Sequence, residues 1–245
     1  MTRFSKDCHK ISILKTGNFV IPIFPISYSL QDSPRLRKSI KGMKTLLSNQ
    51  GYKKIANYIK NVDDGTLPNQ MESLHQTILA KIAGYNHKSD DQSLEEIFHL
   101  IQYWGGRTGR SIYVRGTGFS ENFSLNAYKK ITLESSCFNI DTNASLKRII
   151  SSVHDIHGLG ISFVTKHMRF WAEASNLGLP IYDKLMAQIC FGFDSPQWSH
   201  YLEYYIKMHE AAQKMEVTVN ELERRLFCFA DSEDGGKWIK VRTVK

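Results

Sequence analysis

The sequence has 245 residues, and its 32 Lys and Arg against 24 Asp and Glu give a formal net charge of +8. A chain of this length forms one or two domains and can bury a core without disulfides or metals. Hydrophobic residues make up 42% and aromatic residues 11%, which excludes a largely disordered chain. No apolar run approaches the roughly 18 residues of a membrane span, and FVIPIFP (19–25) lacks the cleavage site of a secretory signal. We therefore expect a basic, globular, cytoplasmic protein without a membrane partner.

Positive charge is concentrated in the first quarter of the chain. From Ser33 to Val62 there is no acidic residue, and the stretch carries Arg35, Arg37, Lys38, Lys41, Lys44, Lys53, Lys54 and Lys60. Such a run fits either a solvated helix face or a contact with nucleic-acid phosphates. The four cysteines, Cys8, Cys137, Cys190 and Cys228, form no CxxC pair, so we expect free thiols and no side-chain metal site.

Helical periodicity dominates the sequence after an irregular or extended N-terminal segment. A strand is predicted at residues 18–23, and Asp32-Ser33-Pro34 is a typical helix start. The spacing of apolar residues predicts helices at 35–47, 52–62, 69–82, 93–103, 120–133, 145–153, from 161, 183–190, 197–214 and 219–229. The glycine-rich segment 104–116 is expected as irregular chain, and 238–241 as a short strand in a polar tail. The predicted fold class is mainly α.

Two of the predicted helices are separated by a tight turn, His157-Gly158-Leu159-Gly160. Glycines at such a turn allow positive φ and the close approach of another backbone. The free N–H groups at the start of the next helix, near Ser162, favour an anion such as phosphate. This is the pattern of a helix-hairpin-helix, which grips the DNA backbone without reading its sequence.

The residues around this turn carry a resemblance to a known family. GLGISFVTKHMRFW (158–171), LPIYD (179–183) and, upstream, WGG (104–106) with GR (109–110) resemble the helix-hairpin-helix DNA glycosylase superfamily. More narrowly, GLGISFVTKHMRFW and LPIYD look like the bacterial proteins related to 8-oxoguanine glycosylase. The resemblance covers Ser145 to Asp183 closely and Trp104 to Cys190 more loosely. It implies a two-lobed helical fold with a DNA cleft between the lobes.

The resemblance makes Asp183, in front of the next predicted helix, the catalytic acid. A carboxylate there stabilises an oxocarbenium-like sugar and orients or deprotonates the attacking nucleophile. Aspartate is also a preferred helix N-cap, and one residue can serve both purposes.

The sequence departs from the family pattern at the nucleophile. Members that also cleave the DNA strand carry a lysine two residues after the second glycine of the turn, where this chain has Ser162. Lys166 lies one helical turn further on, about 6 Å along the axis. The alternatives for Lys166 are a displaced nucleophile, a phosphate contact or a surface charge. We expect one of the latter two roles, with water as the nucleophile.

The remaining candidate residues would contact DNA or a base flipped out of the duplex. Contacts with DNA are predicted for His157, Gly158, Leu159, Gly160, Ser162, Lys166, Arg107 and Arg110. The base pocket or wedge is predicted among Trp104, Tyr113, Phe170 and Trp171, with a place in the core as the alternative for the aromatic residues. No cofactor is expected, except that the resemblance suggests a monovalent cation held by backbone carbonyls of the turn.

The leading hypothesis is a monofunctional bacterial DNA glycosylase that acts as a monomer on double-stranded DNA containing a modified base. The substrate is expected to be oxidised guanine or a phage-type modified cytosine, in repair or phage defence respectively. The alternative is a non-catalytic helix-hairpin-helix module that only binds the DNA backbone. One glycosylase-like unit is predicted, with an N-terminal lobe (1–118), a hairpin lobe (119–230) and a tail (231–245).

Overall fold

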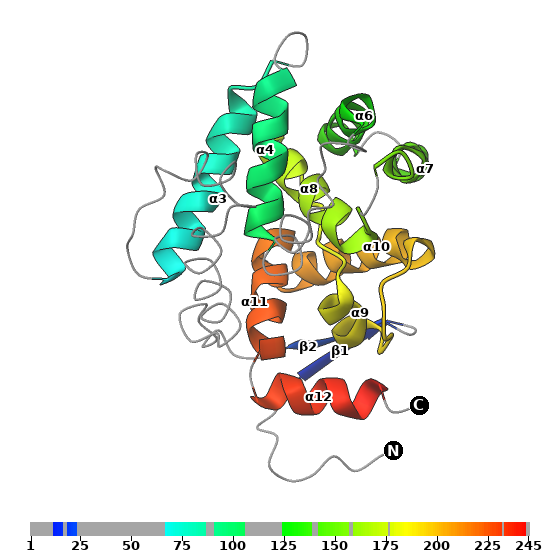
Figure 1. Cartoon of the computed structure of the whole chain (residues 1–245). Helices are drawn as coiled ribbons and strands as arrows, with labels where there is room; N and C mark the ends of the chain where they lie inside the picture. Colours follow the sequence, from blue (N-terminus) through cyan, green and yellow to red (C-terminus); the bar gives the residue numbers. More distant parts are fainter. Residues whose placement is uncertain are drawn as a thin grey trace. The chain divides into compact units, whose positions relative to one another are not determined.

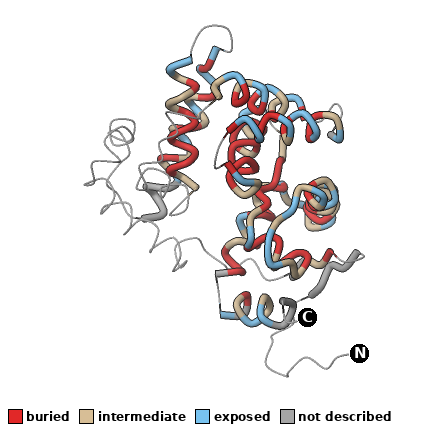
Figure 2. Tube along the Cα trace, turned by 45° about the vertical axis from the view of Figure 1, so that its right-hand side comes forward, coloured by how far each residue is buried: buried red, intermediate tan, exposed pale blue. Residues whose placement is uncertain are grey.

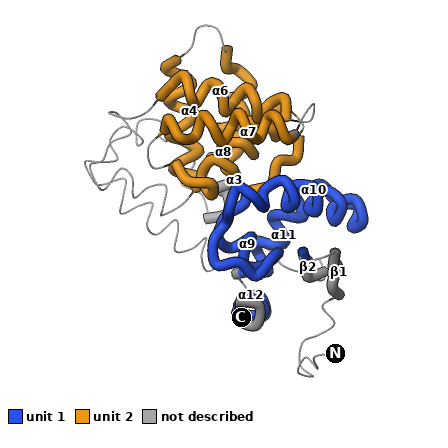
Figure 3. The backbone as a smooth tube through the Cα atoms, turned by 90° about the vertical axis from the view of Figure 1, so that its right-hand side faces the viewer, with its two compact units in different colours: residues 1–33, 182–245 blue, residues 34–181 orange. Residues whose placement is uncertain are grey.

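The computed structural model describes residues 12–16, 19–23, 67–86, 91–105, 124–138, 142–156, 159–175, 177–231 and 233–243. Contacts along the chain divide it into two units (Figure 3): unit 1 is Met1–Ser33 with Tyr182–Lys245, and unit 2 is Pro34–Ile181. The division places Asp183 in unit 1 and the helix after the two-glycine turn in unit 2. The lobe boundary predicted near residue 118 lies outside the described residues.

Unit 1 combines strands from the N-terminal part of the chain with helices from the C-terminal part. Its elements (Figure 1) are β1 (Ser12–Thr16), β2 (Phe19–Ile23), α9 (Lys184–Cys190), α10 (Trp198–Lys214), α11 (Val219–Asp231) and α12 (Glu233–Thr243). The strands are antiparallel, with Thr16 opposite Phe19 and Ser12 opposite Ile23. β2 packs against α9 and α10. The N-terminal hairpin is therefore anchored on C-terminal helices.

The core of unit 1 is rich in aromatic rings. Phe19 of β2 meets Phe191 edge-to-face, with ring centroids 5.3 Å apart. Tyr182 and Tyr204 are fully buried and stack at 4.7 Å, and Tyr201 packs beside both rings. Burial of several large rings supplies much of the apolar area that holds these elements together.

Unit 2 is built around one helix that is buried along most of its length. Its elements are α3 (Leu67–Ala83), α4 (Asp91–Trp104), α6 (Leu125–Ser136), α7 (Thr142–Val153) and α8 (Ile161–Ala174). α8 contacts α3, α4 and α6, while α6 packs on α7. Nine residues of α8 are buried, which makes it the central helix of the unit. Buried and exposed residues alternate along most helices (Figure 2), as expected for amphipathic helices.

The mainly helical fold class predicted from sequence is confirmed. The helices predicted at 69–82, 93–103, 145–153, 197–214 and 219–229 correspond to α3, α4, α7, α10 and α11 within a few residues. α6 begins later than predicted because Ser124 is its N-cap, and the Ser124 side chain accepts a hydrogen bond from the Ala127 N–H. β1 was not predicted, and the predicted basic helices at 35–47 and 52–62 lie outside the described residues.

One predicted element of the tail is wrong. Residues 238–241 were expected as a strand because Trp, Ile and Val favour extended chain, but they belong to α12. Tertiary contacts override this preference: the Trp238 indole N–H donates to the carbonyl of Ile189, and its ring lies 6.5 Å from Phe229. A Cβ at Gly235 would clash with the backbone of Phe229 and Ala230, so this glycine lets α12 approach the end of α11.

Within the described part of the chain, no helix is both long enough and apolar enough to cross a membrane.

Candidate functional site

Asp183 is the N-cap residue of α9. Its backbone is extended (φ −103°, ψ −179°), and its Oδ1 accepts a hydrogen bond of 3.0 Å from the backbone N–H of Met186. This is the capping role expected of an aspartate before a helix. The side chain is half-buried, so its carboxylate is fixed by the helix start while part of the residue remains accessible.

The start of α8 is open at Gly160. Gly160 is the N-cap of α8 without a side-chain cap, and its carbonyl accepts from the N–H groups of Phe163 and Val164. Its φ is −79°, so Gly160 does not use the positive φ that a glycine permits. Among the residues that the structure describes, no atom lies within 4 Å of the place that a Cβ at Gly160 would take. Leu159, before it, is buried.

Lys166 is held inside unit 2, one turn after Ser162. Its Nζ donates to the carbonyl of Ser162 at 2.9 Å and lies 4.8 Å from the centre of the Phe163 ring. The residue is only 8% exposed, which does not fit the solvated surface charge that was one of its expected roles. The amine is thereby directed back along α8 toward the first turn of the helix, where Ser162 itself is half-buried.

Gly105, the residue after α4, lies directly against the Phe163 and Lys166 side chains of α8. A Cβ there would lie 2.7 Å from Cε1 of Phe163 and 3.2 Å from Cδ of Lys166. The first glycine of the WGG sequence therefore has a packing role, because an added methyl group would press on the Phe163 ring and the Lys166 stem. Sequence analysis assigned no role to Gly105, and its place beside a tryptophan and a second glycine gave no sign of this contact.

Trp104 and Phe170, both candidates for the base pocket, belong to one aromatic cluster. Their rings meet edge-to-face at 5.0 Å, and His75 of α3 lies against both rings. Trp104 is half-buried, whereas Phe170 is fully buried. Burial therefore favours the core interpretation for Phe170, while Trp104 keeps an accessible part.

An ion-pair network borders this cluster. Nε2 of His75 lies 3.2 Å from Glu173, whose other carboxylate oxygen is 3.6 Å from Arg169. Burial raises the pKa of Glu173, but the hydrogen bond from His75 and the charge of Arg169 outweigh it, and the net pKa is lowered. These contacts tie α3 to α8.

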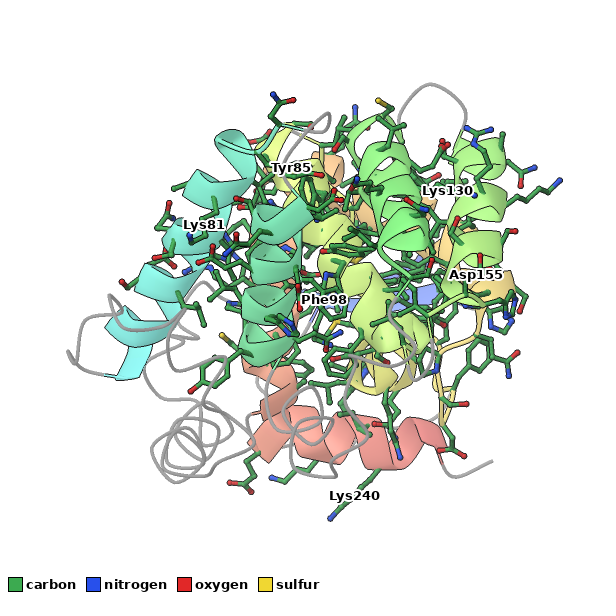
Figure 4. All side chains as sticks on the ribbon, turned by 45° about the horizontal axis from the view of Figure 1, so that its top comes forward. Lys81, Tyr85, Phe98, Lys130, Asp155 and Lys240 are labelled. Atoms are coloured by element: carbon green, nitrogen blue, oxygen red, sulfur yellow. The ribbon has the colours of Figure 1, made fainter. Side chains whose placement is uncertain are left out.

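The second aromatic candidate of α8, Trp171, is part of a buried chain of polar contacts. Its indole N–H donates to the hydroxyl of Tyr128 at 3.2 Å, and that oxygen lies 2.7 Å from Nδ1 of His167. The Gln102 side-chain nitrogen lies 3.2 Å from Nε2 of the same imidazole. All four residues are almost fully buried, so Trp171 is a core residue. Figure 4 labels Phe98, whose ring stacks on His167 from α4.

Several predicted site residues lie outside the described parts of the chain. These are His157 and Gly158 of the turn, and Arg107, Arg110 and Tyr113 of the glycine-rich segment. Within the described ranges, no three His, Cys, Asp or Glu residues gather as a metal site would require. The described candidates are thus Asp183 in unit 1, and Leu159, Gly160, Ser162, Lys166, Trp104 and the core residues Phe170 and Trp171 in unit 2.

These features define a class of protein: mainly helical, with a carboxylate fixed at a helix start as its candidate catalytic group. The family model described as "Putative 8-oxoguanine DNA glycosylase OGG-like protein" matches residues 63–227, and the chain belongs to this family. Membership supports a DNA glycosylase role and a DNA substrate. No curated protein and no solved structure matches the chain.

Proposed function

We propose that this protein is a monofunctional DNA glycosylase in which Asp183 promotes cleavage of the N-glycosidic bond of a flipped-out base. The observation that carries this proposal is the fixed carboxylate: Asp183 lies within the matched region and is held by the Met186 N–H. A catalytic group must be held close to its productive geometry, and a cap bond to the backbone provides that support.

The reaction follows from the chemistry of a carboxylate beside a sugar. As the C1′–N bond breaks, positive charge develops on the sugar, and the negative charge of Asp183 stabilises it. A water molecule then forms the new C1′–O bond, Asp183 accepts one of its protons, and the departing base leaves with the bonding electron pair and takes up a proton. The products are a free base and an abasic site.

Water is the proposed nucleophile because the lysine position of strand-cleaving members is occupied by Ser162. The amine of Lys166 is bonded to the Ser162 carbonyl and packed over Phe163. Release of this amine for attack would break the hydrogen bond and the cation–π contact. Lys166 therefore contributes positive charge near the start of α8, where DNA phosphate would approach Gly160 and Ser162.

For the substrate, the family description favours oxidised guanine, and we take it as the first choice. A bulky phage-type modified cytosine is the second choice. The proposed partner is double-stranded DNA bound by a monomer, with contacts from the two-glycine turn and from Arg107 and Arg110. A monovalent cation on backbone carbonyls of the turn remains part of the proposal.

Asp183→Asn tests the proposal because asparagine caps helices as well as aspartate does, so the variant removes charge while it keeps the cap. The assay measures binding and base release on duplexes that carry one oxidised guanine. The expected result is unchanged binding with base release about 10²- to 10⁴-fold slower. Asp194→Asn, which changes an exposed aspartate of the same unit, is the matched control and should keep full activity. Binding without base release by the unmodified protein, on this duplex and on one with a bulky modified cytosine, would favour a non-catalytic DNA-binding module.

A further inference from the structure

The residue before Asp183 is as firmly placed as the aspartate itself. Tyr182 is fully buried in unit 1, and its ring stacks on Tyr204 of α10 with centroids 4.7 Å apart and planes 27° apart. Tyr204 is fully buried as well. Tyr182 is therefore held against α10 by a pair of stacked rings. Asp183, the next residue, is held against α9 by its cap hydrogen bond.

The cap alone fixes only one side of Asp183. The hydrogen bond to Met186 sets the side chain against α9, but the backbone that enters the cap comes from Tyr182. If the Tyr182 ring were free to shift, the φ and ψ angles of Asp183 would shift with it. A displacement of about 1 Å at a catalytic group can slow a reaction by about 10²-fold.

The surroundings of Tyr204 support this reading. Burial raises the pKa of the Tyr204 hydroxyl well above its ordinary value, and the nearby groups Cys190, Glu223 and Asp183 raise it further. The Tyr204 hydroxyl thus stays protonated, and the face of its ring lies against Tyr182, the residue before Asp183. The same helix also carries Tyr201, an equally buried ring that is tilted 48° to Tyr182 at 6.3 Å rather than stacked on it.

We infer that Tyr204 is a positioning residue for Asp183, because its ring holds Tyr182 and thereby the backbone that presents the carboxylate. This inference rests on the proposed function, since it needs Asp183 to be the catalytic group. It extends that function to α10, a helix for which sequence analysis gave no role.

The test compares three variants of the full chain in single-turnover and steady-state base release. Tyr204→Leu removes the stacked ring, Tyr204→Phe keeps the ring without its hydroxyl, and Tyr201→Leu removes a ring of equal burial from the same helix. Tyr204→Leu should lower kcat by roughly 10- to 100-fold with KM little changed. Tyr204→Phe should restore most of kcat, and Tyr201→Leu should lose thermal stability to a similar extent but much less kcat.

A spectroscopic readout separates positioning from general loss of packing. The backbone amide of Met186 reports the Asp183 cap, so its ¹⁵N–¹H resonance should move in Tyr204→Leu and stay in place in Tyr201→Leu. Equal loss of kcat in both leucine variants, or an unmoved Met186 resonance with full kcat in Tyr204→Leu, would overturn the inference. If Tyr204→Leu does not fold, Tyr182→Leu removes the other ring of the stack and carries the same expectations.

The experiment keeps this inference distinct from the proposed function. Full activity of Asp183→Asn would remove the proposed catalytic group and with it the proposed function. An inactive Asp183→Asn together with a fully active Tyr204→Leu would leave the proposed function standing and reject only the role of Tyr204.

Discussion

Tyr128 and His167 are joined in the core of unit 2 by a hydrogen bond of 2.7 Å between the phenol oxygen and Nδ1. The Gln102 amide lies 3.2 Å from Nε2 on the other side of the ring, so both imidazole nitrogens have a hydrogen-bond partner in the core. Burial, assisted by the charges of Lys166 and His99, lowers the pKa of His167 to about 3.

The lowered pKa of His167 predicts a pH-dependent stability. The unfolded chain binds a proton at His167 below about pH 6.5, whereas the folded protein does so only near 3, so acid favours unfolding between these values. The contribution of His167 is complete above pH 6.5 and falls by about 2 kcal/mol between pH 6.5 and 5. Urea unfolding of the wild type and of His167→Gln at several pH values measures this pH dependence of the free energy of unfolding. Equal pH slopes for the two proteins would contradict the prediction.

Tyr128→Phe should destabilise unit 2 without any change in volume at the ring. It leaves the buried Trp171 Nε1 without its acceptor and the buried His167 Nδ1 without its hydrogen-bond partner, at about 1–3 kcal/mol for each group. Denaturant unfolding should show a lowered midpoint. In a Trp171→Phe background the same substitution should cost less, because one of the two groups is already gone. If the losses in free energy of unfolding caused by Tyr128→Phe and Trp171→Phe simply add, the two hydrogen bonds of Tyr128 are not coupled.

Gly105→Ala and Gly160→Ala form a matched pair with opposite expectations. The new methyl at Gly105 would lie 2.7 Å from Phe163 and should lower the free energy of unfolding by about 1–3 kcal/mol. At Gly160 the methyl meets no described atom within 4 Å and φ is ordinary, so the loss should stay near the ~1 kcal/mol by which alanine is a poorer N-cap than glycine. If DNA backbone approaches Gly160 as proposed, this variant should instead bind DNA about tenfold more weakly, or by about 1.4 kcal/mol. Unchanged DNA affinity would argue against a contact there.

Lys166 should not form a covalent bond with DNA. Borohydride reduces the imine between an amine and an abasic aldehyde, and so would trap a lysine nucleophile on the strand. We expect no trapped complex with the wild type and continued base release by Lys166→Met. A trapped complex that disappears in Lys166→Met would make Lys166 the nucleophile and would replace water in the proposed reaction.

Local signals in the sequence were sufficient for most helices and for the capping position of Asp183. Apolar residues at helical spacing predicted α3, α4, α10 and α11, and the position of Asp183 before an apolar segment predicted its cap. The tail failed because the helical state of α12 depends on Trp238 reaching Ile189, a contact that local preference does not contain. A role for Tyr204 was not predicted for the same reason, because its partner Tyr182 is distant in sequence and adjacent only in the fold.

Base release is the most direct measurement of the central claim that Asp183 promotes glycosidic bond cleavage. The wild type and Asp183→Asn would be incubated with oxidised DNA and with DNA carrying a bulky modified cytosine, and freed bases would be identified by mass spectrometry. We expect the wild type to release one modified base, oxidised guanine by first choice, and Asp183→Asn to release almost none while its melting temperature is unchanged. Release at the wild-type rate by Asp183→Asn would rule out Asp183 as the catalytic group.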